Sequence, residues 1–423
     1  MEIKNYLALF LGFFAVVLGI YLRFKPKKSK STGSSGSERV VLEVQLSRND
    51  EEKRDIQASS LSAENMFSAL HGLLKDDPSI QESLSFEMAA SGERGIRFYV
   101  TTPASVLSFV ESQIYAQYPT SSINIVSDYT PAINTSHTDY KVSSIVFSKP
   151  DYYPIKSFRD FETDPMSSIS SSVSNLKPGE EVWVQVLSRP IADKWQQDGF
   201  DYVNKVREGQ DPGKTKSAYN IFFDVIKKEL FEITAGVLTG LFSRPTDGTE
   251  VKGKYITSVP KISAAKETEL KAIENKLSRM GFETVIRAVS ASTQPDRVDA
   301  NLRSITASLE QFSSTSLNSF LGKNEDNKQS ALDAYKKRDF DSERSIILNT
   351  EEMASLYHFP LSHIDTPNIS WVYSRKSEPP TNLPIENCTY IGETMYRNQS
   401  VKFGIRNDND DRLRHLYVIG KSG

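Results

Sequence analysis

The spacing of apolar and polar residues between positions 38 and 127 predicts four strands and two helices in a fixed order. Segments in which apolar and polar residues alternate indicate strands, and segments in which apolar residues recur every three or four positions indicate helices. The predicted order is strand 38–48, helix 62–74, strand 83–91, strand 94–102, helix 103–118 and strand 121–128. This β-α-β-β-α-β order is typical of a ferredoxin-like module, and we expect its domain to span residues 38–130.

A second α+β module with a large insertion is expected over residues 138–322. The same criteria predict strands at 140–148, 180–190 and 282–292 and helices at 164–176, 264–281 and 296–312. The segments VWVQVLS and TVIRAVSA both have strand composition, so we expect them to pair in one sheet.

The insertion, at about residues 191–255, contains a predicted amphipathic helix over 217–242. Apolar residues recur there at steps of three and four on one face, which consists of Phe222, Ile226, Leu230, Ile233, Val237 and Leu241. Such a helix can lie on a membrane or a partner subunit, or it can pack on the protein's own sheet. The mixed Lys and Glu residues of its polar face favour packing on the sheet over binding to anionic lipid.

Residues 323–385 are expected to form a charged loop, a short helix and a Pro-rich connector. The stretch 324–345 is highly charged and indicates a solvated loop with a short helix. Asn349 is followed three positions later by Glu352, which is the spacing of a capping box at the start of a helix. Pro360 is expected to end that helix.

The amino terminus carries a run of residues that predicts a membrane anchor. Residues 6–22 hold no charge, are close to the roughly 17-residue lower limit for a membrane-spanning helix, and have Tyr6 and Tyr21 near their two ends. A cleaved signal peptide is the alternative, but the positive charges follow the apolar run instead of preceding it. We therefore predict a transmembrane anchor over residues 1–24 and a flexible Ser/Gly/Lys-rich tether over 25–37.

The distribution of basic residues around that run predicts an orientation. Five basic residues directly follow the span, at positions 23, 25, 27, 28 and 30, whereas Lys4 is the one basic side chain before it. The positive-inside rule then places the amino terminus outside and the rest of the chain in the cytoplasm. The predicted location is the inner (cytoplasmic) membrane, with a single pass.

Length, net charge and cysteine content argue against several classes of protein and kinds of binding site. A chain of 423 residues is long enough for two or three domains, and its net charge of −3 argues against a chain that binds nucleic acid through its overall charge. The single cysteine, Cys388, excludes an intrachain disulfide and a zinc site built from this chain's cysteines alone. Of the five histidines, only His358 and His363 are close in sequence, and Pro360 between them favours a structural role over a shared metal.

The last residues, 386–423, predict a β-hairpin or meander that leads into a glycine-rich turn. Strand-like segments surround the polar turn RNDNDDR, whose Asn and Asp residues are explained by turn chemistry rather than by a calcium loop. Basic side chains gather near the end of the chain and could contact phosphate groups, although a solvated turn explains them as well; they are Arg406, Arg412, Arg414 and Lys421.

The chain ends on RHLYVIGKSG, in which a strand-like run precedes Gly420, Lys421, Ser422 and Gly423. A P-loop has the pattern G-x-x-x-x-G-K-[ST] after a strand. The four terminal residues would fill the first half of that pattern as cofactor-binding residues. The second half, which carries the lysine and hydroxyl that bind phosphate and Mg²⁺, is not in the sequence. We find no other set of catalytic residues and no metal-ligating set, so we predict no catalysis by these residues.

Two segments resemble the stretch that leads into the P-loop of HerA/FtsK-superfamily ATPases, especially type IV secretion coupling proteins. They are ILNTEEMASLYHFP (347–360) and the terminal stretch from IGETMYRNQSVKFGI to RHLYVIGKSG. The resemblance covers about the last eighty residues. It implies an incomplete part of a longer ATPase that uses ATP and Mg²⁺. It also implies assembly into a hexameric ring through the missing domain, DNA or a secreted protein as the substrate, and other secretion-complex subunits as partners.

Together these features predict an α+β protein, with a transmembrane helix, ferredoxin-like modules and a terminal β-hairpin entering a P-loop domain. The expected function is that of a membrane-tethered accessory region of a bacterial type IV secretion or conjugation-like translocating ATPase. It would anchor and assemble the motor, with the lipid bilayer as one partner. The alternative is a non-enzymatic scaffold or adaptor of a bacterial membrane complex.

Overall fold

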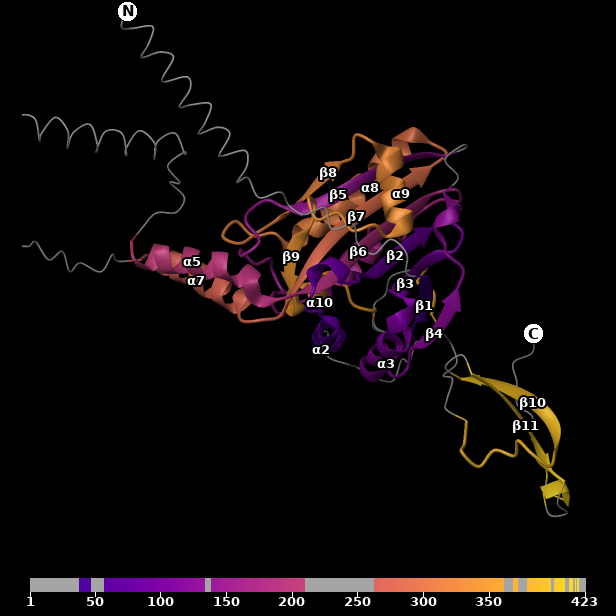
Figure 1. Ribbon diagram of the computed structural model, residues 1–423. Coiled ribbons are helices and arrows are strands. Elements are labelled where there is room, and N and C mark those ends of the chain that lie inside the picture. The colour runs from indigo at the N-terminus through magenta and orange to yellow at the C-terminus, as the bar shows by residue number, and fades with distance from the viewer. Residues whose placement is uncertain are drawn as a thin grey trace, which may run out of the picture. The chain divides into compact units, whose positions relative to one another are not determined.

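The computed structural model describes residues 38–46, 57–133, 138–209, 262–360, 368–371, 379–396, 399–407, 411–413, 415 and 417. Among these residues the main element is one antiparallel sheet of nine strands (Figure 1). Eight of the strands follow the order β4-β1-β3-β2-β6-β7-β5-β8, and the ninth strand, β9, pairs with β7. The protein is therefore a mixed α/β protein built on a large antiparallel sheet.

The first half of the sheet, which we call repeat 1, contains strands β1 to β4 and two helices. In chain order they are β1 (Arg39–Gln45), α2 (Ala58–Leu70), β2 (Leu84–Ser91), β3 (Gly95–Pro103), α3 (Leu107–Gln117) and β4 (Ser122–Val126). This is the element order that the hydrophobic pattern predicts. Gly92, Glu93 and Arg94 connect β2 and β3 in a short hairpin.

The second half, which we call repeat 2, has the same element order. It consists of β5 (Asp139–Phe147), α4 (Pro165–Ser171), β6 (Glu181–Ile191), β7 (Gly281–Ser292), α8 (Pro295–Ser308) and β8 (Phe320–Asn324). The strand order within the sheet is also the same, because β8-β5-β7-β6 corresponds strand for strand to β4-β1-β3-β2. The sheet is thus a tandem of two β-α-β-β-α-β units.

The two repeats meet where β2 pairs with β6, and we call this junction the seam. The pairing extends from Leu84 opposite Ser188 to Ser91 opposite Glu181. The seam joins the second strand of each repeat, so the fourth strands, β4 and β8, lie at opposite edges of the sheet (Figure 1).

A segment that we call the clasp, residues 327–359, follows repeat 2. It contains α9 (Lys328–Lys337), β9 (Ile346–Asn349) and α10 (Thr350–Leu356). β9 extends the sheet by pairing with the first residues of β7, from Gly281 to Thr284. The sequence predicts a solvated loop and short helices in this part of the chain, and the structure adds the strand β9.

The sheet has an apolar core on each face because side chains alternate along its strands. On one face, residues such as Leu42, Phe86 and Val184 pack against α2, α3, α4, α8 and α10. On the other face, Val41, Ala89 and Trp183 pack with Leu332 and Tyr335 of α9. The clasp therefore contributes a helix to each face of the sheet.

The predicted fold class needs correction in two respects. First, the α+β modules are not separate bodies, because β2 pairs over its whole length with β6 and the two modules form one sheet. Second, the predicted transmembrane helix finds no counterpart: among the residues that the structure describes, no helix is long and apolar enough to cross a membrane. The longest described helices, α7 and α8, have 14 residues, whereas a span needs about 20.

The predicted localisation depended on that transmembrane helix and is corrected with it. The apolar run at 6–22 lies outside the described residues, and so do the whole predicted tether, 25–37, and the amphipathic segment 217–242.

A helix pair and a β-hairpin are not part of the nine-stranded sheet. A pair of helices, α5 (Gln196–Arg207) and α7 (Ala264–Leu277), is inserted between β6 and β7. Arg207 donates two hydrogen bonds to Glu274 and links the two helices. A hairpin of β10 (Cys388–Tyr396) and β11 (Gln399–Arg406) forms its own two-stranded sheet. β11 pairs with β10, the strand before it, and most of the predicted strand after the RNDNDDR turn lies outside the described residues.

Candidate functional site

Helix α10 begins with the capping box that the sequence predicts. The Asn349 side chain accepts a hydrogen bond from the Glu352 backbone N–H at 2.8 Å, and the Glu352 carboxylate accepts one from the Asn349 N–H at 3.0 Å. The capping box satisfies two backbone donors that a helix start leaves without partners. The prediction is therefore confirmed.

The polar side chains of α10 also bind the loop that precedes α4. The second oxygen of Glu352 accepts a hydrogen bond from the Ile155 N–H at 2.9 Å, and the Ser355 hydroxyl accepts one from the Phe158 N–H at 2.8 Å. Glu352 is almost fully buried, and Ser355 is completely buried. A seven-residue helix thus fixes a loop almost 200 positions away in sequence.

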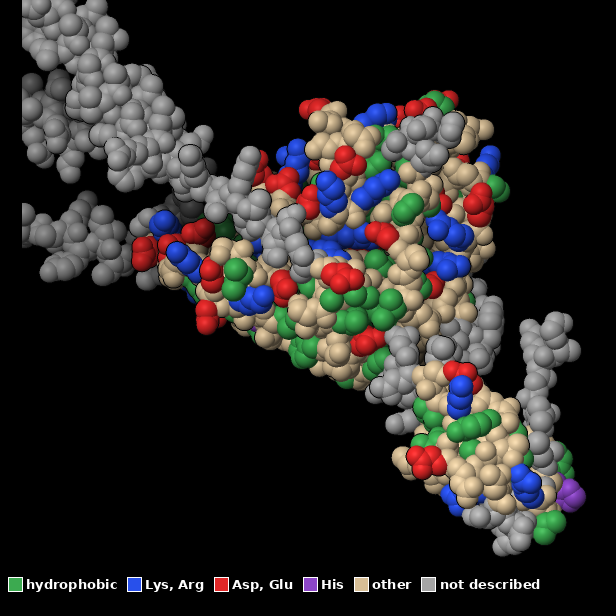
Figure 2. Space-filling model, turned by 45° about the vertical axis from the view of Figure 1, so that its right-hand side comes forward, with side chains coloured by type: hydrophobic (Ala, Val, Ile, Leu, Met, Phe, Trp, Pro, Cys, Tyr) green, Lys and Arg blue, Asp and Glu red, His purple; other side chains and the backbone are tan. Residues whose placement is uncertain are grey.

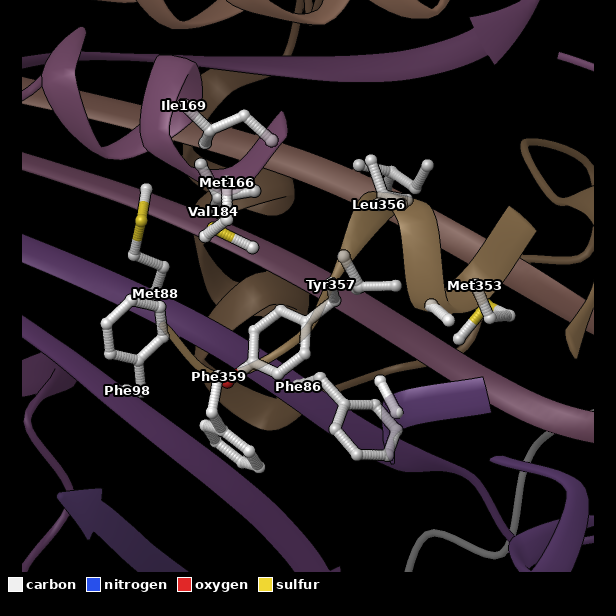
Figure 3. Close-up of a cluster of buried hydrophobic side chains, with 14 of the residues drawn as sticks. Phe86, Met88, Phe98, Met166, Ile169, Val184, Met353, Leu356, Tyr357 and Phe359 are labelled. Carbon is white, nitrogen blue, oxygen red and sulfur yellow. The ribbon is translucent and has the colours of Figure 1, made fainter. Parts of the chain in front are cut away.

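The apolar side of the clasp lies over the seam. Figure 3 shows Met353, Leu356, Tyr357 and Phe359 close to side chains of both repeats. Those side chains come from β2, β3, β6 and α4, and they are Phe86, Met88, Phe98, Val184, Met166 and Ile169. Aromatic rings of the clasp meet those of repeat 1, with Tyr357 at 5.5 Å from Phe86 between ring centroids. The packing joins residues of the two repeats into one core.

The opposite face of the seam is bound by the end of α9. Arg338 follows α9 with a positive φ of 55° and points its guanidinium at Glu87 of β2. Its Nε and Nη2 donate to the two carboxylate oxygens of Glu87 at 3.0 and 3.1 Å. Nη2 also donates to Asp128 at 3.1 Å. Glu87 is fully buried, so this is an ion pair inside the protein.

Glu87 is the point at which both halves of the clasp meet repeat 1. Its side chain is held by Arg338, and its backbone oxygen accepts a hydrogen bond from the Tyr357 hydroxyl at 3.3 Å. On the repeat 2 side, Gln185 lies directly opposite Glu87 across the seam and donates to both the Glu87 carboxylate and the Tyr335 carbonyl. The seam is therefore bound by hydrogen bonds in addition to apolar contacts.

Burial and charge determine the ionisation of these groups. Burial lowers the pKa of Arg338, but the Glu87 carboxylate and the bonds to Asp128 outweigh it and raise the pKa overall. Burial raises the pKa of the Tyr335 and Tyr357 hydroxyls, and the charge of Glu87 raises both further. Arg338 is thus a permanent cation beside hydroxyls that stay protonated. This arrangement suits structural pairing rather than proton transfer.

A short strap continues from the clasp. The Ile369 side chain is buried, and Ile369 forms a parallel β-bridge with Ile96 of β3. The Ile96 N–H donates to the Asn368 carbonyl at 2.8 Å, and the Ile96 carbonyl accepts from the Ser370 N–H at 3.0 Å. The Asn368 amide donates to the Ser174 carbonyl at 2.9 Å, in the segment after α4. The strap, residues 368–371, therefore also contacts both repeats.

The predicted nucleotide-binding residues, Gly420, Lys421, Ser422 and Gly423, lie outside the described residues. Of the predicted basic cluster, Arg406 and Arg412 are described and exposed, and Arg412 donates to Thr389 and Asn407 within the hairpin. Cys388 is half-buried and carries a free thiol.

Charge and metal-ligating residues offer no alternative site in the described part of the chain. Figure 2 shows basic and acidic side chains mixed over the face in view. Across the described ranges, no group of three or more His, Cys, Asp or Glu residues could hold a metal ion. His358 is buried beside Asp164, and its sequence neighbour His363 lies outside the described residues.

Comparison with known families identifies the family of this protein. The model of a domain of unknown function, DUF8128, matches residues 27–372, so the chain belongs to this family. A search of curated proteins finds no match. The matched range contains both repeats, the clasp and the strap, and it ends before the β10–β11 hairpin.

The sequence alone did not identify the partners of the clasp. Glu87 stands out in the sequence because it is a charged residue within the otherwise apolar or small-residue strand LSFEMAAS. Arg338 does not stand out, because it is one of many charged residues between 324 and 345. The capping box was visible because its two residues are three positions apart, whereas Arg338 and Glu87 are separated by 251 positions.

Proposed function

We propose that this chain is a non-catalytic assembly platform that precedes the P-loop domain of a HerA/FtsK-type translocating ATPase. The platform consists of the two repeats, and the clasp with its strap is the element that couples it to the motor. ATP and Mg²⁺ would be bound by the motor domain, a hexameric ring would form through that domain, and DNA or a secreted protein would be its substrate.

The position of the clasp is the observation that carries this proposal. Residues 347–360, which resemble the segment that leads into the ATPase P-loop, fill the seam and contact both repeats. A force on this segment would reach the whole sheet, because its side chains are bound on strands and helices of each repeat. The strap then continues the chain toward the hairpin that begins the second segment of resemblance.

The chemistry of the described residues is consistent with a non-catalytic role. The titratable groups at the seam are paired with one another and buried, as Arg338 is with Glu87. A catalytic acid or base needs access to a substrate. Paired, inaccessible charges instead stabilise one arrangement of the two repeats.

The coding sequence beyond codon 423 provides the first test. We expect it to continue with Thr or Ser, Gly, Lys, and Ser or Thr, which would complete the P-loop. Any other sequence would overturn the ATPase assignment and leave the scaffold or adaptor function as the alternative.

Hydrolysis assays provide the second test. We expect the 423-residue chain to show no ATP hydrolysis, and the longer product to hydrolyse ATP and assemble into a ring. In the longer product, Leu356→Ala should reduce assembly or hydrolysis, whereas Leu61→Ala, at an exposed position of α2, should not. Equal activity of the wild type and Leu356→Ala at a temperature where both are folded would contradict coupling through the clasp.

A further inference from the structure

The end of the clasp carries a buried histidine whose two ring nitrogens both face acceptors. His358 Nδ1 lies 2.8 Å from the Ala354 carbonyl oxygen, and Nε2 lies 2.7 Å from Asp164 Oδ1. A carbonyl and an ionised carboxylate can only accept hydrogen bonds, so both nitrogens must donate. With Asp164 ionised, this geometry requires the ring to be an imidazolium. His358 is fully buried, and Asp164 nearly so.

Asp164 has a second role at the same oxygen. It is the N-cap of α4 and accepts the Met166 N–H at 2.7 Å. Its charge thus stabilises the start of α4 as well as the imidazolium. The pair connects the last residues of the clasp with the first residues of a repeat 2 helix.

We propose that His358 and Asp164 form a pH-sensitive lock, in which the imidazolium fastens the end of the clasp to α4 and deprotonation releases it. Loss of the proton removes one of the two donated hydrogen bonds and leaves the buried carboxylate of Asp164 without its counter-charge. An uncompensated buried charge is strongly destabilising. The segment 357–359 is the part of the clasp that this change would free.

Other titratable groups around the pair do not replace this interaction. Directly after α3, the buried Tyr118 hydroxyl donates to the Ser59 carbonyl, and burial raises the pKa of Tyr118. From α2, Ser60 lies 3.5 Å from His358 Nδ1. The acidic side chains of α2 and α10 nearest in sequence have their own partners: Glu64 and Glu351 bind Arg159, and Glu352 binds backbone N–H groups.

The direction of the pH effect follows from the electrostatics. Burial lowers the pKa of His358, but the Asp164 charge and both hydrogen bonds outweigh it, so the pKa lies above its usual value. A histidine whose pKa is raised by folding stabilises the folded state. This stabilisation is complete below the pKa of histidine in the unfolded chain, which is about 6.5. This stability is lost as the pH rises through the folded value. The lock is therefore closed below about pH 6.5 and opens as the pH rises through the folded pKa of His358.

An NMR titration of the wild-type protein with ¹³C-labelled histidine tests the charge state without any variant. The exposed His415 serves as the internal reference, and the His358 resonance is assigned by its loss in His358→Gln. We expect His358 to keep the imidazolium shift to a higher pH than His415. A neutral His358 ring throughout, or a midpoint at or below that of His415, would overturn the proposal.

Hydrogen exchange followed by mass spectrometry tests the release. After correction for intrinsic exchange, peptides covering 350–360 should lose protection as the pH rises through the His358 midpoint, while β6 peptides keep theirs. His358→Gln should show low protection at every pH. His71→Gln, at a half-buried histidine whose ring contacts the Ile191 carbonyl, should keep the wild-type response. Protection of 350–360 that does not change with pH in the wild type would contradict the lock.

Discussion

Arg338 and Glu87 form an ion pair with two hydrogen bonds, although 251 positions separate them and Arg338 is only 4% exposed. Arg338 adopts a left-handed backbone conformation, which a residue with a side chain rarely takes without compensation. The compensation is the placement of its guanidinium under the seam, where Glu87 and Asp128 both accept from it. The pair therefore fixes the position of the clasp on the sheet.

Truncation of one partner of this pair should destabilise the protein strongly. We expect Arg338→Ala to lower the free energy of unfolding by about 3–5 kcal/mol, because it leaves the Glu87 charge buried without its counter-charge. The double variant Glu87→Met/Arg338→Met should recover most of this loss, since it removes both charges. Denaturant titration measures the difference. As a control, Lys141→Ala breaks an exposed pair with Asp299 and should cost no more than about 1 kcal/mol.

The turn of the β2–β3 hairpin requires a glycine for steric reasons. A Cβ atom on Gly92 would lie 1.8 Å from the Lys177 carbonyl oxygen, so Gly92→Ala should destabilise the protein by about 1–3 kcal/mol. Gly72 has no atom within 4 Å of the corresponding position and is not at positive φ. We therefore expect Gly72→Ala to be neutral or slightly stabilising. Equal melting temperatures of the two variants would contradict the close approach at Gly92.

Packing of the clasp on the seam predicts a cavity effect. Leu356→Ala should lower the free energy of unfolding by about 2–5 kcal/mol, as for other fully buried leucines. Tyr357→Phe keeps the ring and removes the hydroxyl that donates to Glu87, so we expect a smaller loss of about 0.5–1.5 kcal/mol. A loss from Tyr357→Phe as large as that from Leu356→Ala would show that the hydrogen bond, not the packing, dominates.

Acid sensitivity should arise in part from Glu180, which precedes β6. Hydrogen bonds from Arg297 lower the pKa of Glu180 to about 2, despite the opposing effect of burial, and the Lys177 N–H adds to the shift. The unfolded value is about 4.3. The resulting stability is present above this value and is lost as the pH falls toward 2.

Urea titrations between pH 7 and pH 2 measure this contribution. We expect Glu180→Gln to lower the stability at pH 7 and to flatten its decline in acid. Glu93→Gln, at an exposed residue of the β2–β3 turn, should keep the wild-type profile. An unchanged acid profile in Glu180→Gln would contradict a role for the pair with Arg297.

Local patterns predicted much of the element order. The alternation around Phe86 and Met88 and around Val182 and Val184 indicates strands, and both strands are present. The capping box at Asn349 is likewise a local signal. These features depend on residues within a few positions of one another, and the sequence displays them directly.

Features that depend on residues far apart in sequence are not predicted by local patterns. The segment around Tyr335 was predicted to be solvated because charges surround it, yet Tyr335 is fully buried between the sheet and Tyr129. The strand pairing across the seam was also missed, because β2 and β6 each have a free edge when considered within their own repeat. Neither feature can be seen without knowing which distant segment supplies the partner.

Cooperativity between the repeats is the most direct test of the central claim that the clasp joins them into one unit. Hydrogen exchange over a denaturant series should follow peptides from β2, β6 and α10 in the same sample. We predict that all three lose protection at the same denaturant concentration in the wild-type protein. Separate transitions for β2 and β6 in the wild type would contradict the claim.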